Sequence, residues 1–217
     1  MLIGITGLKR SGKDTAANHL IDKFGYVKIG FADALKDIIR EHLSCVTITD
    51  EDRETPQTFT VFTSELKKAA AKLSLDTDEM INLFVHQFSG YEQGIVFESL
   101  DDVSFTYHMT YRQVMQTFGT NVCRRLNENI WVDCVEKKLM DNPKTDYVVT
   151  DIRFDNEAEM VNGLWGTIVE IKRDNAAQLD YHASEQGIHK DYLDHTILNT
   201  AISVLQDRIE EVHYYIC

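Results

Sequence analysis

A glycine-rich stretch near the start of the chain, GLKRSGKDT at residues 7–15, has the composition and spacing of a site for nucleotide phosphates. Glycine permits the backbone angles that point successive N–H groups into one concavity at the start of a helix, where they can bind phosphate oxygens. Lys13 adds a mobile positive charge that could reach the outer phosphates. The pattern predicts a phosphate-binding loop, with a chance run of turn residues as the alternative. The predicted loop residues are Gly7, Lys9, Arg10, Ser11, Gly12, Lys13, Asp14 and Thr15.

Asp14 departs from the usual pattern, in which a Ser or Thr hydroxyl follows the lysine and holds Mg²⁺. A carboxylate is also a hard oxygen ligand, so we expect Asp14 to bind the metal directly or through water. Lys9, Arg10 and Lys13 could offset its negative charge, and Thr15 could still donate a hydrogen bond to a phosphate. The alternative is an acidic residue that only stabilises the positive end of a helix dipole.

Two further groups of residues could contribute to the same chemistry. In VTDIRFDNE at 149–157, Asp151 follows an apolar strand and could serve the metal, while Arg153 could stabilise a transferring phosphoryl group. The alternative is a turn held by salt bridges. Arg112 and Arg124 lie twelve residues apart and could bind a second phosphate, and Gln116 between them could contact a base edge. By itself this last pattern is weak, and a solvated helix face is the default interpretation.

The elements around these motifs alternate between strand and helix. Residues 2–6, LIGIT, read as a buried strand that leads into the loop, and the apolar spacing after Ser11 predicts a helix that ends at Gly25. This strand and helix supply the context that a phosphate-binding loop requires. A strand at 26–31 and a helix through Leu35–Leu43 follow, which is the order of an α/β fold with a parallel sheet.

Later segments continue the alternation after an irregular middle. We expect residues 45–108 to form an insertion or lid within a single 1–217 domain, with helix over 64–88 and two short strands over 95–108. Thr110 and Gln113 have capping-box spacing and predict a new helix there. The central parallel sheet should have about five strands. The remaining predicted elements are helices at 128–141, 155–164 and 202–212 and strands at 146–150, 167–171 and 195–198.

Composition narrows the class of protein. The 217 residues carry a formal charge of −13, so the chain has no general attraction for nucleic-acid polymers or anionic membranes. The four cysteines form no C-x-x-C pair, which argues against a zinc or redox motif. The chain shows neither a signal peptide nor an apolar run of membrane-spanning length. We therefore expect a soluble protein of the cytoplasm.

Taken together, the motifs resemble those of bacteriophage deoxynucleoside monophosphate kinases. They occur in the family's order along nearly the whole chain, and the resemblance is weakest between about 56 and 108. The loop with Asp after Lys is also similar to animal phosphomevalonate kinases, but the helix that begins at Arg112 favours the phage enzymes. The segments that carry the resemblance are GLKRSGKDT, FADALK at 31–36, DRET at 52–55, RQVMQTFGT at 112–120 with Trp131, TDIRFDNEAE at 150–159 and HASE at 182–185.

The resemblance implies a three-layer P-loop kinase fold and transfer of the ATP γ-phosphoryl group to a deoxynucleoside 5′-monophosphate, with Mg²⁺ required. It implies that the loop binds ATP, that Lys13, Arg10, Arg153 and Asp151 serve catalysis, and that Asp14 and Asp151 serve the metal. It also makes a homodimer plausible. If a phage encodes the chain, we expect the protein in the cytoplasm of the host cell. The residues it places around the acceptor are Asp33, Lys36, Arg53, Glu54, Arg112, Gln116, Thr120 and Arg124.

Two alternatives stay open at the level of sequence. One is a kinase for another small phosphorylated acceptor, such as phosphomevalonate. The other is a nucleotide-binding switch without catalysis, for which Asp14 in place of a hydroxyl would be the argument. The acceptor-side motifs speak against the switch, since a switch does not need them. The sequence does not specify which bases are accepted.

Overall fold

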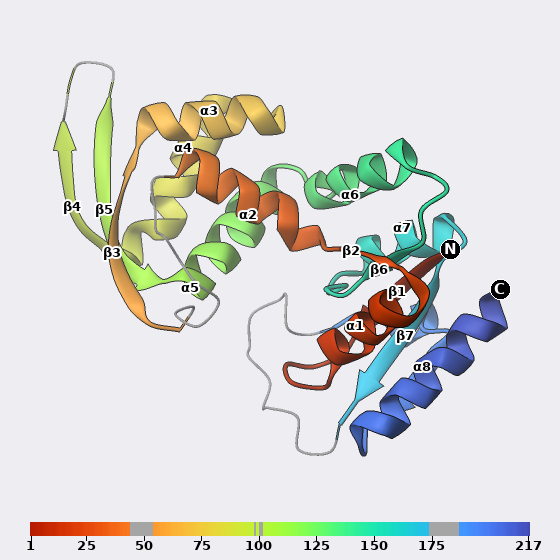
Figure 1. The fold of residues 1–217 in the computed structure, drawn as a ribbon. Coiled ribbons are helices and arrows are strands. Elements are labelled where there is room, and N and C mark those ends of the chain that lie inside the picture. Colours follow the sequence, from red (N-terminus) through yellow and green to blue (C-terminus); the bar gives the residue numbers. More distant parts are fainter. Residues whose placement is uncertain (44–53, 98, 100–101, 174–186) are drawn as a thin grey trace. The chain divides into compact units, whose positions relative to one another are not determined.

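A computed structural model describes residues 1–43, 54–97, 99, 102–173 and 187–217 of the chain (Figure 1). These residues form two compact units. The first combines Met1–Phe31 with Val132–Cys217, and the second is the continuous segment Ala32–Trp131 between them. The segment expected to be an insertion, 45–108, falls within the bounds of the second unit, which also includes residues on either side of it.

The first unit is built on a parallel sheet, five strands wide in the described part of the chain. Its order is β2-β6-β1-β7-β8, so β1 (Leu2–Thr6) lies in the centre between two strands from the second half of the sequence. The predicted α/β class and the parallel sheet are therefore confirmed. The other strands are β2 (Val27–Ile29), β6 (Tyr147–Val149), β7 (Thr167–Lys172) and β8 (His195–Leu198).

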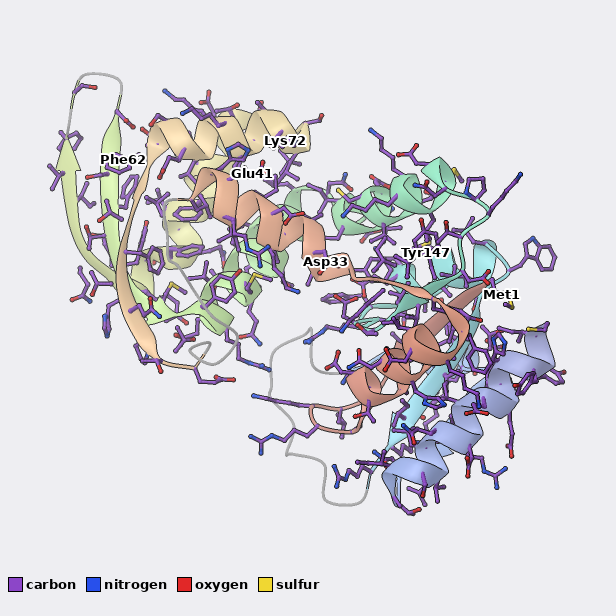
Figure 2. The ribbon with its side chains drawn as sticks, in the orientation of Figure 1. Met1, Asp33, Glu41, Phe62, Lys72 and Tyr147 are labelled. Atoms are coloured by element: carbon purple, nitrogen blue, oxygen red, sulfur yellow. The ribbon has the colours of Figure 1, made fainter. Side chains whose placement is uncertain are left out.

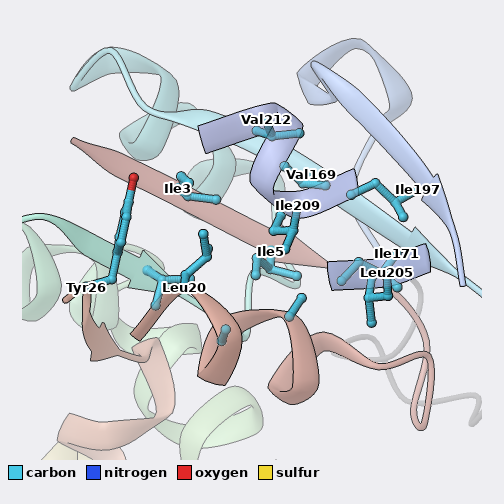
Figure 3. Packing of buried hydrophobic residues seen from close by; sticks show 13 residues of the cluster. Ile3, Ile5, Leu20, Tyr26, Val169, Ile171, Ile197, Leu205, Ile209 and Val212 are labelled. Carbon is cyan, nitrogen blue, oxygen red and sulfur yellow. The ribbon is translucent and has the colours of Figure 1, made fainter. Parts of the chain in front are cut away.

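Helices cover both faces of this sheet, which explains why all five residues of β1 are buried. On one face, Ile3 and Ile5 pack against α1 (Lys13–Phe24) and α8 (Ile202–Ile216) through Leu20 and Leu205 (Figure 3). On the other face lies α7 (Asp155–Gly163). A methyl group added to Gly4 would come within 3.4 Å of Val161 on that helix. The first unit therefore has three layers, with α6 (Ile130–Asp141) leading into it from the second unit.

Glycines set the two ends of α1. Gly12 precedes the helix in a left-handed conformation, and Gly25 follows it with φ of 75° and donates its N–H to the Ile21 carbonyl at 3.0 Å. A left-handed residue after the last turn satisfies a carbonyl that the helix leaves unpaired. The helix end predicted at Gly25 is thus confirmed.

The second unit contains a three-stranded antiparallel sheet of described residues, ordered β3-β5-β4. Strands were expected only for β4 (Glu92–Phe97) and β5 (Val103–Thr110); β3 (Pro56–Phe62), in a stretch that looked merely polar, was missed. The single helix expected over 64–88 is instead two helices, α3 (Thr63–Leu73) and α4 (Thr77–Phe88). The break occurs because Asp76 caps α4 by accepting a hydrogen bond from the Glu79 N–H at 2.9 Å.

Aromatic rings fill the core of the second unit. Tyr107 is wholly buried, with Phe88 at 5.3 Å and Phe84 at 5.8 Å between ring centroids, and Phe84 stacks on Phe88 at 4.0 Å. Burial raises the pKa of Tyr107 above its usual range. Phe118 joins this cluster edge-on. The core therefore anchors the helical segment that carries Phe118, in which several acceptor residues were predicted.

That segment begins as α5 (Tyr111–Gln116) and continues as the π-helix η3 (Thr117–Arg124). The unit also contains α2 (Phe31–His42), from Ala32 onward. The predicted capping box is present, since Thr110 Oγ1 accepts from the Gln113 N–H at 3.1 Å and Gln113 Oε1 accepts from the Thr110 N–H at 2.8 Å. Short 3-10 turns lie at η2 (Ser89–Tyr91) and, in the first unit, at η5 (Lys190–Tyr192).

Asp102 forms an acidic cap at the start of α3. Asp102 accepts hydrogen bonds from the Ser64 N–H at 3.0 Å, the Ser64 hydroxyl at 2.8 Å and the Thr63 hydroxyl at 2.8 Å, at the start of α3. These bonds favour the charged carboxylate and lower the pKa of Asp102. In none of the described helices is there an apolar stretch long enough to cross a membrane.

Candidate active site

The loop between β1 and α1 takes a conformation that its glycines make possible. Gly7 has φ of 139° and Gly12 has φ of 112°, angles that residues with a side chain rarely adopt. A Cβ at Gly7 would lie 2.3 Å from the backbone oxygen of Ile171 on β7, so the loop leaves the sheet with no room for a side chain. Arg10 also has a positive φ, 66°, at the tip of the loop. The loop is thus closely fitted to the edge of the sheet.

Asn199, just beyond β8, holds the other end of the loop. Its Nδ2 donates a hydrogen bond to the backbone oxygen of Ser11 at 2.7 Å, and Asn199 is itself buried. A Cβ at Gly12 would lie 2.4 Å from the same Nδ2. Within the loop, the Ser11 N–H donates to the Leu8 oxygen at 3.1 Å. The loop is therefore held both by a hydrogen bond within it and by Asn199, a residue from late in the sequence.

Lys13 concentrates positive charge over this loop. Its Nζ donates to the backbone oxygens of Gly7 at 2.7 Å and Leu8 at 2.9 Å, so the ammonium curls back across the turn. Lys9 and Arg10 are exposed at the tip. An anion that settles on the N–H groups of the loop would meet these cations and the positive end of α1. This arrangement can bind phosphate groups.

Asp14 lies in the first turn of α1 and forms an ion pair with Lys28 of β2. The distance between Asp14 Oδ1 and Lys28 Nζ is 2.6 Å, and the two side chains are 75% and 42% exposed. Thr15 follows in the same turn and is half-buried. The structure thus gives Asp14 a cationic partner outside the loop, one that sequence motifs did not indicate.

Asp151 and Arg153 follow β6, whose carboxyl end lies beside that of β1. The Thr6 hydroxyl donates to the backbone oxygen of Ile152 at 2.9 Å, which ties the start of the loop to the segment between the two predicted residues. Asp151 Oδ1 accepts from the Phe31 N–H at 2.9 Å at the beginning of α2. The sheet therefore brings the loop, Asp151 and Arg153 to one edge, as expected from parallel strands.

The residues at this edge fit a magnesium ion that arrives with a nucleotide. Asp14 and Asp151 offer carboxylate oxygens, and Mg²⁺ is usually held by one or two carboxylates together with substrate phosphates. Among the residues that the structure describes, no group of three or more His, Cys, Asp and Glu side chains forms a metal cage. Two carboxylates are a donor set that phosphate oxygens and water could complete.

The predicted acceptor residues belong to the second unit. Asp33, labelled in Figure 2, lies in the first turn of α2. Its Oδ1 accepts a hydrogen bond from Lys36 Nζ at 3.2 Å. Arg112 Nη1 lies 3.8 Å from Glu54 Oε1, so two of the predicted residues form an ion pair. Arg53 lies outside the described residues, as does the HASE segment at 182–185.

Ideal helix geometry places four of the predicted acceptor residues along one side of the α5–η3 segment. Arg112, Gln116, Thr120 and Arg124 are spaced four residues apart. In an α-helix, each step of four residues moves the side-chain position about 40° round the helix axis. The π-helix η3 has about 4.4 residues per turn, so a step of four residues there stops short of a full turn and moves the side-chain position in the opposite direction. The π-helix thus keeps the four positions in one row, which we call the acceptor row.

Close packing fixes the middle of this row. A Cβ at Gly119 would lie 2.4 Å from Leu35 on α2, and Trp131 Nε1 donates to the Gly119 oxygen at 3.1 Å. Gly119 therefore allows α2, which carries Asp33 and Lys36, to approach η3 closely. The Gly-Thr and Trp131 of the sequence motif have a structural role at this contact.

Comparisons of the sequence with known proteins identify the family of this chain. The family model for deoxynucleotide monophosphate kinase matches residues 1–102 and 49–209. A protein of Acanthamoeba polyphaga mimivirus, named as a candidate deoxynucleotide monophosphate kinase, is 30% identical over 197 residues, covering 85% of this chain and 80% of its own. The deoxynucleotide monophosphate kinase of Escherichia phage RB69 is 26% identical over 242 residues, covering 97% and 98%.

Among solved structures, the dephospho-CoA kinase from Campylobacter jejuni aligns with 99% of this chain and 96% of its own, with 13% identity and a TM-score of 0.42. The family assignment itself comes from the sequence relatives. The two matches of the family model together run from residue 1 to residue 209, so they include the loop, the acceptor row and the Asp151 segment. By these sequence matches, this chain belongs to the deoxynucleotide monophosphate kinase family.

Proposed function

We propose that this chain transfers the γ-phosphoryl group of ATP to a deoxynucleoside 5′-monophosphate, forming the diphosphate and ADP. The observation that carries the proposal is the phosphate loop, shaped by Gly7, Gly12 and Asn199, in a member of this kinase family. A kinase of this family uses ATP as its phosphoryl donor. The printed names of the relatives support a nucleoside monophosphate as the acceptor.

On the donor side, the N–H groups of residues 7–15 would bind the ATP phosphates. Lys13 would leave the backbone oxygens of Gly7 and Leu8 and reach the outer phosphates, while Arg10 would add charge at the tip. Arg153 would stabilise charge on the group in transfer. A magnesium ion bound by Asp14 and Asp151 with the phosphates would neutralise charge on the ATP oxygens.

On the acceptor side, we assign the monophosphate and its base to Asp33, Lys36, Glu54 and the acceptor row, with Arg53 retained from the sequence motif. Arg112 and Arg124 would pair with phosphate oxygens, because a guanidinium forms two parallel hydrogen bonds to such a group. Gln116 would contact a base edge, and Thr120 would position the nucleotide between them. The single row gives one extended ligand three or four contacts from one helix.

The reaction needs little covalent help from the protein. Both phosphates are negative, so the barrier comes mainly from repulsion and misalignment, and fixed cations and N–H groups lower it. We further propose that residues 45–108 act as a lid that excludes water, which would limit hydrolysis of ATP. Protection of this segment from protease when ATP and a monophosphate are both present would support the lid.

Other properties follow as proposals from charge and family. The formal charge of −13 favours a role without nucleic-acid polymers. A cytoplasmic setting supplies both nucleotides, and a homodimer is the oligomer we propose. Size-exclusion chromatography with light scattering would test the oligomer directly.

A coupled assay of ADP formation tests the function. The purified chain is given ATP, Mg²⁺ and, in turn, each of the four deoxynucleoside monophosphates, with phosphomevalonate and no acceptor as comparisons. We expect ADP formation to depend on at least one deoxynucleoside monophosphate. ADP formation that is equal without acceptor, or that requires phosphomevalonate, would refute the proposal.

A further inference from the structure

Lys28 is a charged residue at the nucleotide edge that no motif of the chain includes. It lies on β2, an outer strand of the parallel sheet, and its Nζ is 2.6 Å from Asp14 Oδ1. We propose that Lys28 is a positioning residue of the nucleotide site: it holds the Asp14 carboxylate in one orientation and neutralises it beside the phosphate loop. The inference rests on the proposed function in that it takes the loop to bind ATP.

The need for such a partner follows from where Asp14 lies. The first turn of α1 is the place where a helix dipole and unpaired N–H groups favour an anion. In a phosphate loop that anion is the nucleotide, so a bare carboxylate there would repel it. Lys28 converts Asp14 into a neutral pair, which leaves the positive potential of the loop available to phosphate.

Lys13 is placed for a different task. Its ammonium lies over the loop on the oxygens of Gly7 and Leu8, at 2.7 and 2.9 Å, where phosphates would bind. Lys28 approaches Asp14 from the sheet instead. The two lysines therefore separate two functions: one offers charge to the ligand, and the other offsets the acid that replaces the usual hydroxyl.

The pair also gives the carboxylate a direction. Because Oδ1 is bonded to Lys28, the pair limits how the Asp14 carboxylate can turn. The same short strand leads through Gly30 to Phe31, whose N–H is bonded to Asp151 Oδ1 at 2.9 Å. A Cβ at Gly30 would lie 2.9 Å from Asp151 Oδ2. Residues 28–31 thus orient both acids that we assign to the metal.

The test measures nucleotide binding without any acceptor. Isothermal titration calorimetry would compare ATP with EDTA and ATP with excess Mg²⁺ on the wild type, Lys28→Met, Lys28→Arg, Asp14→Asn and the double variant Asp14→Asn/Lys28→Met. We expect Lys28→Met to weaken metal-free ATP about tenfold, and MgATP less, because the metal also neutralises Asp14. Lys28→Arg should restore most of the affinity.

The double variant distinguishes positioning from direct contact. If Lys28 acts through Asp14, Lys28→Met in the Asp14→Asn background should change ATP affinity by less than about twofold. An equal loss in both backgrounds would mean that Lys28 contacts phosphate itself and would overturn the inference. No loss in the Lys28→Met single variant would overturn it as well.

Lys23→Met is the matched control. Lys23 also forms a 2.6 Å ion pair, with Glu210, and is 45% exposed, close to the 42% of Lys28. It lies at the far end of α1, so its loss should leave ATP affinity unchanged, and unfolding temperatures report whether each variant is folded. A chain that shows the expected binding pattern but phosphorylates no deoxynucleoside monophosphate would overturn the proposed function and leave the role of Lys28 standing.

Discussion

Asn199 donates a hydrogen bond from its side-chain amide to the backbone oxygen of Ser11 at 2.7 Å, across 188 positions of sequence. The contact is buried, so its loss leaves the Ser11 oxygen without that donor inside the protein. We expect Asn199→Ala to cost about 1–3 kcal/mol of unfolding free energy and to weaken ATP binding. Denaturant unfolding and ATP titration measure the two effects. The neighbouring exposed Thr200→Ala should change neither, and a comparable loss there would argue against a specific anchor.

Gly12 and Gly25 allow a comparison of steric contact with backbone strain. Both have positive φ, but a Cβ at Gly12 would meet Asn199 Nδ2 at 2.4 Å, whereas nothing lies within 4 Å of a Cβ at Gly25. Gly25→Ala should therefore cost only about 1–2 kcal/mol, the strain of a left-handed alanine. Gly12→Ala should cost more and should also abolish measurable ATP binding. Equal stability losses, with ATP binding retained in both, would contradict the fit of the loop to Asn199.

Lys13→Ala tests the charge that lies over the loop. The ammonium bonds to two loop oxygens in the absence of ligand, and these bonds are partly exposed, so the fold should survive its removal. We expect kcat/KM for phosphoryl transfer to fall at least ~100-fold, as for other groups that stabilise a transition-state charge. Circular dichroism should match the wild type. Full activity in this variant would exclude the role that we assign to Lys13.

Arg112→Ala tests the acceptor row. Arg112 lies in the row and Arg125 lies one position off it, so Arg125→Ala is the matched loss of charge. We expect Arg112→Ala to raise the KM for the monophosphate roughly tenfold, because a charge-assisted contact is lost, with the KM for ATP unchanged. Arg125→Ala should leave both constants near wild type. The reverse order would show that the row is not the acceptor contact.

Asp102 should give the second unit an acid-sensitive cap. Hydrogen bonds from Ser64 and Thr63 lower its pKa in the folded state. Its contribution to stability is therefore complete above the ordinary carboxyl pKa of about 3.9 and is lost as the pH falls through the lower folded value. Asp102→Asn should reduce the unfolding temperature at pH 7, and the difference from wild type should shrink below about pH 4.

Thermal unfolding between pH 3 and pH 7 measures that convergence. Asp141→Asn, at an exposed position near the end of α6, is the control and should follow the wild-type pH profile. A constant difference between Asp102→Asn and wild type at every pH would show that the charge of Asp102 is not what stabilises the cap.

Local sequence patterns were sufficient where structure depends on neighbours in the chain. The turn glycines, the helix end at Gly25 and the capping box at Thr110 are all decided within a few residues, and the sequence predicted each of them. The break between α3 and α4 was also readable, because Asp76 precedes Glu79 by the spacing of a helix cap. The apolar spacing on both sides concealed it.

Contacts between distant segments were beyond local patterns. β3 pairs with β5 along its whole length; its TFTVF run is rich in residues that favour strands, but the polar residues before it concealed that signal. Lys28 and Asn199 lie outside every motif, and only the order of the parallel strands brings them to the loop. The π-winding of η3 has no sequence signature that we recognise, yet it is what aligns residues four apart over three turns.

The strand order has a consequence for how the protein is made. Both neighbours of β1 in the sheet come from beyond residue 140, and the side chain that anchors the loop is residue 199. A ribosome therefore releases the loop sequence first and its supporting contacts last. Through most of synthesis the nascent chain carries the complete phosphate motif on an unpaired strand. The ability to hold a nucleotide should arise late and abruptly, when the last strand joins the sheet.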